Sequence, residues 1–99
     1  MSRKVLWTAE AEVALSDLLA YLGTAWGRTA ASAFYDDVER TVALLKVFPE
    51  AGVIEVLDKG IRSIPLARQV RLFYLMAGGN VIILQLIDMR SGRMQQIRE

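Results

Sequence analysis

The stretch VRLFYLMAGGNVIILQLID, residues 70–88, decides how this chain folds. Two runs rich in β-branched and aromatic side chains, 70–76 and 81–88, flank the tetrapeptide AGGN. Adjacent glycines between two such runs favour a tight β-hairpin, because both central turn positions need a positive φ. With Gly78-Gly79 as the two-residue loop, the predicted pairs are Met76 with Val81, Tyr74 with Ile83, Phe73 with Leu84, and Arg71 with Leu86.

Alternation along the two strands gives this hairpin two faces. One face is predicted to carry Val70, Leu72, Tyr74, Met76, Val81, Ile83, Gln85 and Ile87. The other is predicted to carry Arg71, Phe73, Leu75, Ile82, Leu84, Leu86 and Asp88. Both faces are largely apolar, whereas an antiparallel sheet with one wet side alternates between apolar and polar side chains. We therefore expect the chain after residue 88, a second copy or another protein to cover one of them.

Two helices precede the hairpin. Thr8 is the expected N-cap of the first helix, whose apolar face is formed by residues 11, 14, 15, 18, 19 and 22. Gly23 and Gly27 are expected to mark its end and a turn around Trp26. The second helix is expected from about residue 28 to residue 48, since Pro49 disfavours helical backbone just before it. The short connector makes the pair an antiparallel helical hairpin.

Two further strands complete the predicted fold. They cover residues 3–7 and 60–66, the second with Pro65 as a sign of an edge or a bulge. The element order is then β-α-α-β-β-β in one domain spanning residues 1–99. The sequence therefore predicts an α+β fold, in which an antiparallel pair of helices packs on one face of a small, mostly antiparallel, twisted sheet.

The composition excludes several classes of protein. The 99 residues suffice for one domain, and 54% of them are hydrophobic, which argues against intrinsic disorder. The chain has no Cys and no His, so it lacks disulfides, cysteine zinc sites and the usual general base at neutral pH. Since no membrane span or secretory signal is evident, we expect a cytoplasmic protein without metal or cofactor.

Positive charge gathers in the second half of the chain. Residues 51–99 carry seven basic and four acidic side chains, and six of the seven are arginines. Arginine suits bidentate recognition of carboxylate or phosphate, so this half favours an anionic partner. Ordinary solvated ion pairs are the alternative.

Six short motifs follow one another along nearly the whole chain. They are Trp7-Thr8-x-x-Ala11-Glu12, Tyr21-Leu22 with Trp26-Gly27, Leu45-x-x-Phe48-Pro49-x-x-Gly52, Gly60-Ile61-Arg62, Arg71-Leu72-Phe73-Tyr74, and Leu84 through Asp88-Met89-Arg90. In this order they resemble the RelE/ParE superfamily of bacterial toxins from toxin–antitoxin (plasmid stabilisation) modules, and most closely its ParE-like branch. The resemblance implies a helical hairpin on a twisted sheet and a cognate antitoxin that wraps the toxin. It also implies one of two targets, since ParE-like members poison DNA gyrase and RelE-like members cleave mRNA in the ribosomal A site.

The resemblance to RelE-like enzymes implies a basic cluster on the sheet and a tyrosine in the C-terminal tail. Arg62, Arg71 and Arg90 match basic positions of that cluster, but Ile64 stands where another lysine is expected. The tail after Arg90 holds no Tyr and no His. Arginine stabilises negative charge but exchanges protons poorly. No catalytic residue is therefore assigned, and the three arginines remain candidates for target contact or for a reduced RNase site.

We expect structural roles for three other polar residues, Tyr74, Asp88 and Glu99. Tyr74 is predicted to be a core aromatic residue. Asp88 and Glu99 could act as bases, but we expect them to pair with an arginine such as Arg90. If the three arginines share one face of the sheet, they form an anion-binding surface, and this depends on a register that the sequence leaves open.

The surplus of apolar side chains favours a groove for an acidic, amphipathic antitoxin helix. One candidate surface lies on the sheet and consists of Leu72, Met76, Ile83 and Ile87. The competing surface is the exposed side of the helical hairpin, formed by Leu15, Leu19, Phe34 and Val38. Ordinary core packing and homodimerisation are the alternatives for both sets.

Together these features predict a ParE-like toxin that binds and poisons DNA gyrase and is held inactive by its antitoxin. The alternatives are a RelE-like, ribosome-dependent mRNA interferase with a reduced site, and an inactive relic that only binds its antitoxin.

Overall fold

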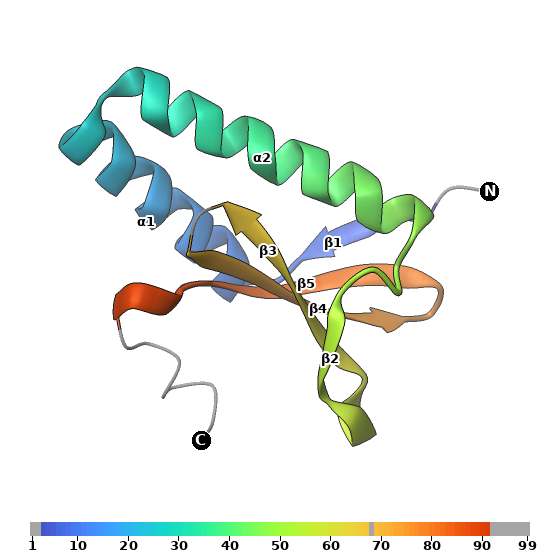
Figure 1. Ribbon diagram of the computed structural model, residues 1–99. Helices are drawn as coiled ribbons and strands as arrows, with labels where there is room; N and C mark the ends of the chain where they lie inside the picture. Colours follow the sequence, from blue (N-terminus) through green and yellow to red (C-terminus); the bar gives the residue numbers. More distant parts are fainter. Residues whose placement is uncertain (1–2, 68, 92–99) are drawn as a thin grey trace.

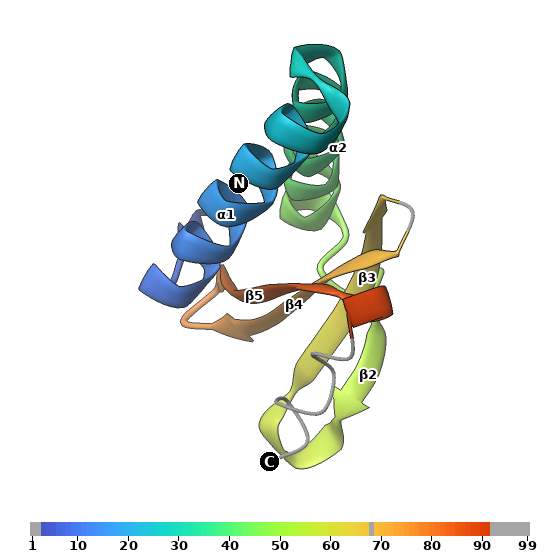
Figure 2. The same cartoon turned by 90° about the vertical axis from the view of Figure 1, so that its left-hand side faces the viewer.

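The computed structural model describes residues 3–67 and 69–91 and has the predicted α+β architecture. Its elements are β1 (Val5–Trp7), α1 (Ala9–Trp26), α2 (Arg28–Val47), β2 (Val53–Val56), the 3-10 turn η1 (Leu57–Lys59), β3 (Ile61–Ala67), β4 (Val70–Ala77), β5 (Asn80–Asp88) and the 3-10 turn η2 (Met89–Ser91). The sheet order is β1-β5-β4-β3-β2, and only the β1–β5 pair is parallel. Both helices lie on one side of this strongly twisted sheet (Figures 1 and 2).

The helical hairpin is joined by one residue, Gly27. Its φ of 98° is a conformation that side chains other than glycine rarely adopt, and its N–H closes α1 by donating to the carbonyls of Leu22 and Gly23 at 3.1 Å. The expectation that α1 ends at Gly23 is wrong, because the helix continues through that glycine to Trp26. Helix α2 ends within one residue of the prediction, since Phe48, before the proline, is its C-cap.

One strand was not predicted. Residues Val53–Val56 form β2, which has β3 as its one neighbour among the described strands, so the order is β-α-α-β-β-β-β. Three of its four side chains are exposed. Because neither of its faces is buried, β2 lacks the alternation of apolar and polar residues from which strands are recognised. Figure 2 shows the β2–β3 end of the sheet extending away from the helices.

The register of the central hairpin is right near the turn and wrong beyond it. Met76 pairs with Val81 and Tyr74 with Ile83, as predicted. A register shift between Phe73 and Tyr74 then leaves Leu84 unpaired, so that Phe73 pairs with Gln85 and Arg71 with Ile87. This bulge turns Leu86 to the helix side, where it joins the core, and turns Gln85 and Ile87 to the opposite face.

The core lies between the helical hairpin and one face of the sheet. It is built from Ala11, Phe34, Val38, Leu45, Ile64, Leu66, Val70, Leu72, Tyr74, Val81, Ile83 and Leu86. Thr8 fixes the start of α1 against β5: its hydroxyl accepts from the Ala11 N–H at 3.1 Å and lies 3.0 Å from the carbonyl oxygens of Ile83 and Leu84. The helix therefore begins at the bulge, which sets its position on the sheet.

Candidate functional site

The three candidate arginines do not converge on one site. Arg62 pairs with Tyr74 across β3 and β4, whereas Arg71 pairs with Pro65, three positions further along β3. Because neighbouring residues of a strand point to opposite faces, Arg62 lies on the helix side of the sheet and Arg71 on the other side. Arg90 stands beyond the end of β5, in η2. The register, which the sequence left open, therefore places Arg62 and Arg71 on different faces, so these two do not share one anion-binding surface.

Arg62 holds the loop that follows α2. Its Nη1 donates to the carbonyl of Gly52 at 2.8 Å and to that of Glu50 at 3.3 Å. Tyr74 binds the same loop from beneath: its hydroxyl donates to the Pro49 carbonyl at 2.7 Å and accepts from the Gly52 N–H at 2.9 Å. A β-carbon on Gly52 would lie 2.7 Å from the Tyr74 hydroxyl, so this position requires glycine. The side chains of Arg62 and Tyr74 thus hold the backbone of the loop at residues 49–52 in place.

Tyr74 is unsuited to proton transfer in this environment. Its side chain is completely buried, as the sequence predicts for a core aromatic residue. Burial raises the pKa of the phenol above its ordinary value of 10.0, although the Gly52 N–H and the charge of Arg62 act in the opposite direction. The phenol therefore stays protonated at neutral pH and donates to the loop.

Arg71 belongs to a polar chain on the sheet face away from the helices. Its Nε donates to Ser63 Oγ at 3.0 Å, and its Nη2 lies 3.4 Å from the Ser63 carbonyl oxygen. The Ser63 hydroxyl in turn donates to Glu55 Oε2 at 2.5 Å, which ties β2 to β3 and β4. Ser63 is fully buried, so its hydroxyl joins strands and has no access to a substrate.

Arg90 pairs with Asp88, as expected from the sequence. Its Nε lies 3.6 Å from Asp88 Oδ1, and its backbone N–H donates to the same oxygen at 3.0 Å. The guanidinium is more than half exposed, so it is the candidate arginine best placed to meet another molecule. Glu99, the other expected partner, lies outside the described residues.

Burial divides the residues predicted to contact an antitoxin. Leu72 and Ile83 are completely buried, and Phe34 and Val38 are only 5% and 2% exposed. The expectation that Phe34 and Val38 lie on the exposed side of the hairpin is wrong, because both face the sheet and belong to the core.

The rest of this set differs in exposure and in face. Leu15 and Leu19 are half-buried at the edge of the core, and Met76 is exposed. Ile87 is buried on the opposite face from Leu72, because of the bulge.

An apolar groove lies where the far end of the helical hairpin meets the ends of β3 and β5. It has a volume of about 530 Å³. Tyr21 and Trp26 are 55% and 72% exposed, and both line it together with Leu18, Leu22, Phe34 and Val70. Asp37, Asp88 and Arg90 add charge to the lining.

The sequence analysis missed this groove, although Tyr21 and Trp26 stood in one of its motifs. The groove includes Trp26 because α1 runs past Gly23 and ends at Trp26. An aromatic residue next to the glycine that ends a helix was the available signal.

None of the described helices is long and apolar enough to cross a membrane.

Comparison with known proteins agrees with the fold. No curated protein matches the chain by sequence. Among solved structures, a chain described as "Chromosomal ParDE TA system from P. aeruginosa" superposes with a TM-score of 0.73 at 21% sequence identity, covering 87% of this chain and 95% of that one. The family model for the ParE toxin of the type II toxin–antitoxin system, parDE, matches residues 5–94. Since this match spans nearly the whole sequence, the chain belongs to the ParE toxin family of type II toxin–antitoxin systems.

Proposed function

We propose that this ParE-family toxin arrests growth in the cytoplasm by binding and poisoning DNA gyrase, without cutting RNA, and that a cognate antitoxin neutralises it. Family membership and the separation of the arginines support this proposal. Cleavage of RNA through its 2′-hydroxyl needs a base, a cationic group for the phosphorane and an acid around one phosphate. In the described part of the chain, the candidate groups for that work are turned to different faces.

The side-chain partners of these groups support binding over catalysis. Arg62 is occupied by loop carbonyls, and Arg71 by Ser63. Tyr74 is buried and holds backbone. Among the three candidate arginines, Arg90 is the exposed one, and an arginine alone stabilises charge without transferring protons.

The antitoxin is proposed to lay an amphipathic helix into the groove that Tyr21 and Trp26 line. Aromatic side chains that are exposed beside an apolar groove are typical anchors of protein interfaces. Leu15, Leu19 and Met76 remain candidate contacts, because each keeps some exposed surface. Apolar and aromatic contacts would carry the binding at this groove, because Arg90 pairs with Asp88 and Asp37 also lines it.

The target is tested with the purified full chain. It should inhibit supercoiling by gyrase and leave ribosome-bound mRNA intact in primer extension, and added antitoxin should restore supercoiling. Cuts at the A site without inhibition of gyrase would identify the chain as an mRNA interferase instead. Expression without antitoxin should arrest growth, and harmless expression of soluble protein would identify an inactive relic.

The antitoxin surface is tested by exchanging one exposed aromatic residue. Trp26→Ala should weaken antitoxin binding at least tenfold, as loss of a buried anchor at an interface does. Tyr35→Ala is the matched control, since Tyr35 is 44% exposed on α2 and does not line the groove. Equal binding by both variants would place the antitoxin elsewhere.

A further inference from the structure

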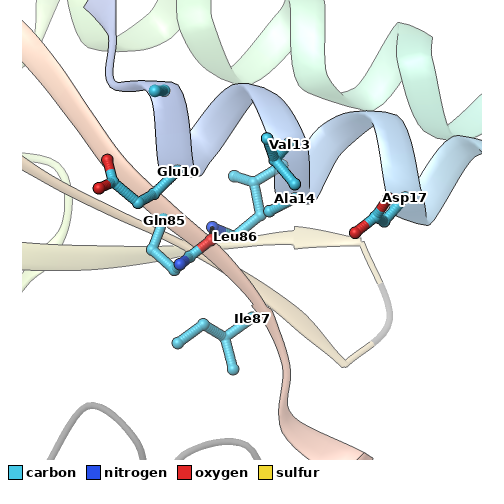
Figure 3. A pocket seen from close by; sticks show the side chains of 8 residues that line it. Glu10, Val13, Ala14, Asp17, Gln85, Leu86 and Ile87 are labelled. Atoms are coloured by element: carbon cyan, nitrogen blue, oxygen red, sulfur yellow. Dashed lines mark hydrogen bonds between the residues drawn. The ribbon is translucent and has the colours of Figure 1, made fainter.

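A second groove, of about 390 Å³, lies between α1 and the outer edge of β5 (Figure 3). We propose that it binds an extended, basic segment of a partner protein, which adds a strand beside β5. This goes beyond the proposed function, because it concerns another surface and a partner segment of the opposite charge to the expected antitoxin helix. The proposal rests on the end of β5, beside which no described strand lies, and on the side chains that stand over it.

The edge of β5 is only partly covered. Strand β1 pairs with Val81, Ile82 and Ile83 and then ends. The next residue, Thr8, donates its backbone N–H to the carbonyl of Ile83 at 3.1 Å. Beyond this point α1 leaves the sheet plane, so no described strand lies beside Gln85, Leu86 and Ile87 on that side. Unpaired backbone at a strand edge is a template for another strand.

The side chain of Gln85 accepts a hydrogen bond that a neighbouring strand would otherwise accept. The N–H of Leu86 donates to Gln85 Oε1 at 3.1 Å, where a neighbouring strand would supply a backbone carbonyl. This bond joins adjacent residues and breaks by rotation of one side chain, so an incoming carbonyl can replace it without any movement of the backbone. The Leu86 N–H is therefore satisfied in the free protein and can exchange this partner for a carbonyl of an added strand.

The wall of the groove selects the charge of the occupant. Glu10 and Asp17 line it from α1, with Val13 and Ala14 between them (Figure 3). Val13 is 59% exposed. The two carboxylates are seven residues apart on one helix, or about 10 Å along its axis.

Neither Glu10 nor Asp17 makes an ion pair within residues 3–67 and 69–91. Lysine or arginine side chains on the face of the added strand that points toward α1 would pair with both, and their alkyl stems would cover Val13. An acidic segment would instead be repelled.

The experiment uses the full chain labelled with ¹⁵N and a short, blocked peptide of alternating lysine and valine. Binding should move the amide signals of Gln85, Leu86 and Val13, and it should weaken as salt is raised. Glu10→Gln/Asp17→Asn should reduce the affinity roughly three- to tenfold, as expected for the loss of two exposed ion pairs. Asp36→Asn/Asp58→Asn, which removes the same charge from exposed sites outside the groove, should bind like the unchanged chain.

Three results would overturn the proposal. One is equal or tighter binding of a matched peptide of alternating glutamate and valine. Another is a set of shifted signals at β2, the other edge of the sheet, with β5 unaffected. The third is self-association of the peptide-free chain that Glu10→Gln/Asp17→Asn abolishes, because the edge would then serve a second copy.

Discussion

Replacing Tyr74 with phenylalanine tests whether its hydroxyl group supports the fold or takes part in the activity of the toxin. The change keeps the ring and removes the oxygen that donates to the Pro49 carbonyl at 2.7 Å and accepts from the Gly52 N–H at 2.9 Å. Both of these residues are buried, so two backbone groups lose their partner away from water. Each such loss costs about 1–3 kcal/mol, and we expect a total of about 3 kcal/mol. For a domain of this size that is a large share of a stability of about 5–15 kcal/mol.

Urea unfolding followed by circular dichroism measures this loss. The midpoint should fall with little change in slope, and Tm should fall by roughly 12–24 °C. Tyr21→Phe is the matched control, since the Tyr21 side chain is exposed, and it should change the stability by less than about 0.5 kcal/mol. Toxic activity per folded molecule should be unchanged in Tyr74→Phe. A variant of normal stability that has lost its activity would refute the structural role of this hydroxyl.

The pH dependence gives a second check on Tyr74. Its pKa is raised in the folded state, chiefly by burial, so its contribution to stability is complete below pH 10 and is lost as the pH rises through the folded pKa. The stability difference between the unchanged chain and Tyr74→Phe should therefore narrow above pH 10. A constant difference up to pH 11 would show that the phenol is not desolvated.

Five further substitutions test the neighbouring structure. Gly52→Ala places a β-carbon 2.7 Å from the Ser63 carbonyl oxygen and should lower the free energy of unfolding, measured in urea, by about 2–4 kcal/mol. Gly23→Ala is the control, because its β-carbon enters open space in a helix, and it should raise the free energy of unfolding by up to about 1 kcal/mol. Thr8→Ala should cost about 1–2 kcal/mol in the same assay through loss of the cap, and an unchanged midpoint would contradict this role. Arg62→Ala should lower stability by about 1 kcal/mol through loss of its bond to the Gly52 carbonyl. Arg90→Ala should leave stability unchanged and weaken toxicity in a growth assay. Equal stability of the two variants would contradict the loop contact of Arg62.

The hairpin and the helices were predictable because their signals are local. Gly78 and Gly79 both adopt a positive φ, so the turn and the first pairs beside it follow from two glycines. The threonine cap of α1 and the proline after α2 likewise act on the backbone next to them. The end of α1 was missed because a glycine in a helix costs only about 1 kcal/mol, which packing of the following turn can offset.

The candidate site was less predictable, because it depends on pairing between distant residues. The bulge at Leu84 shifts the register by one position, which exchanges the faces of Gln85, Leu86 and Ile87. Ile87, chosen as part of a partner surface on the unshifted register, therefore lies on the other face.

The sequence by itself determined the two helices, the hairpin and the family of this protein, because capping, turn chemistry and periodicity act within a few residues. Tertiary structure alone decided that Arg62 and Arg71 point away from each other and that Tyr74 serves a loop. It also decided that no described strand pairs with the end of β5 beside Glu10 and Asp17. The physical reason is that the facing and burial of a strand residue depend on register, and register is set by contacts between segments far apart in the chain.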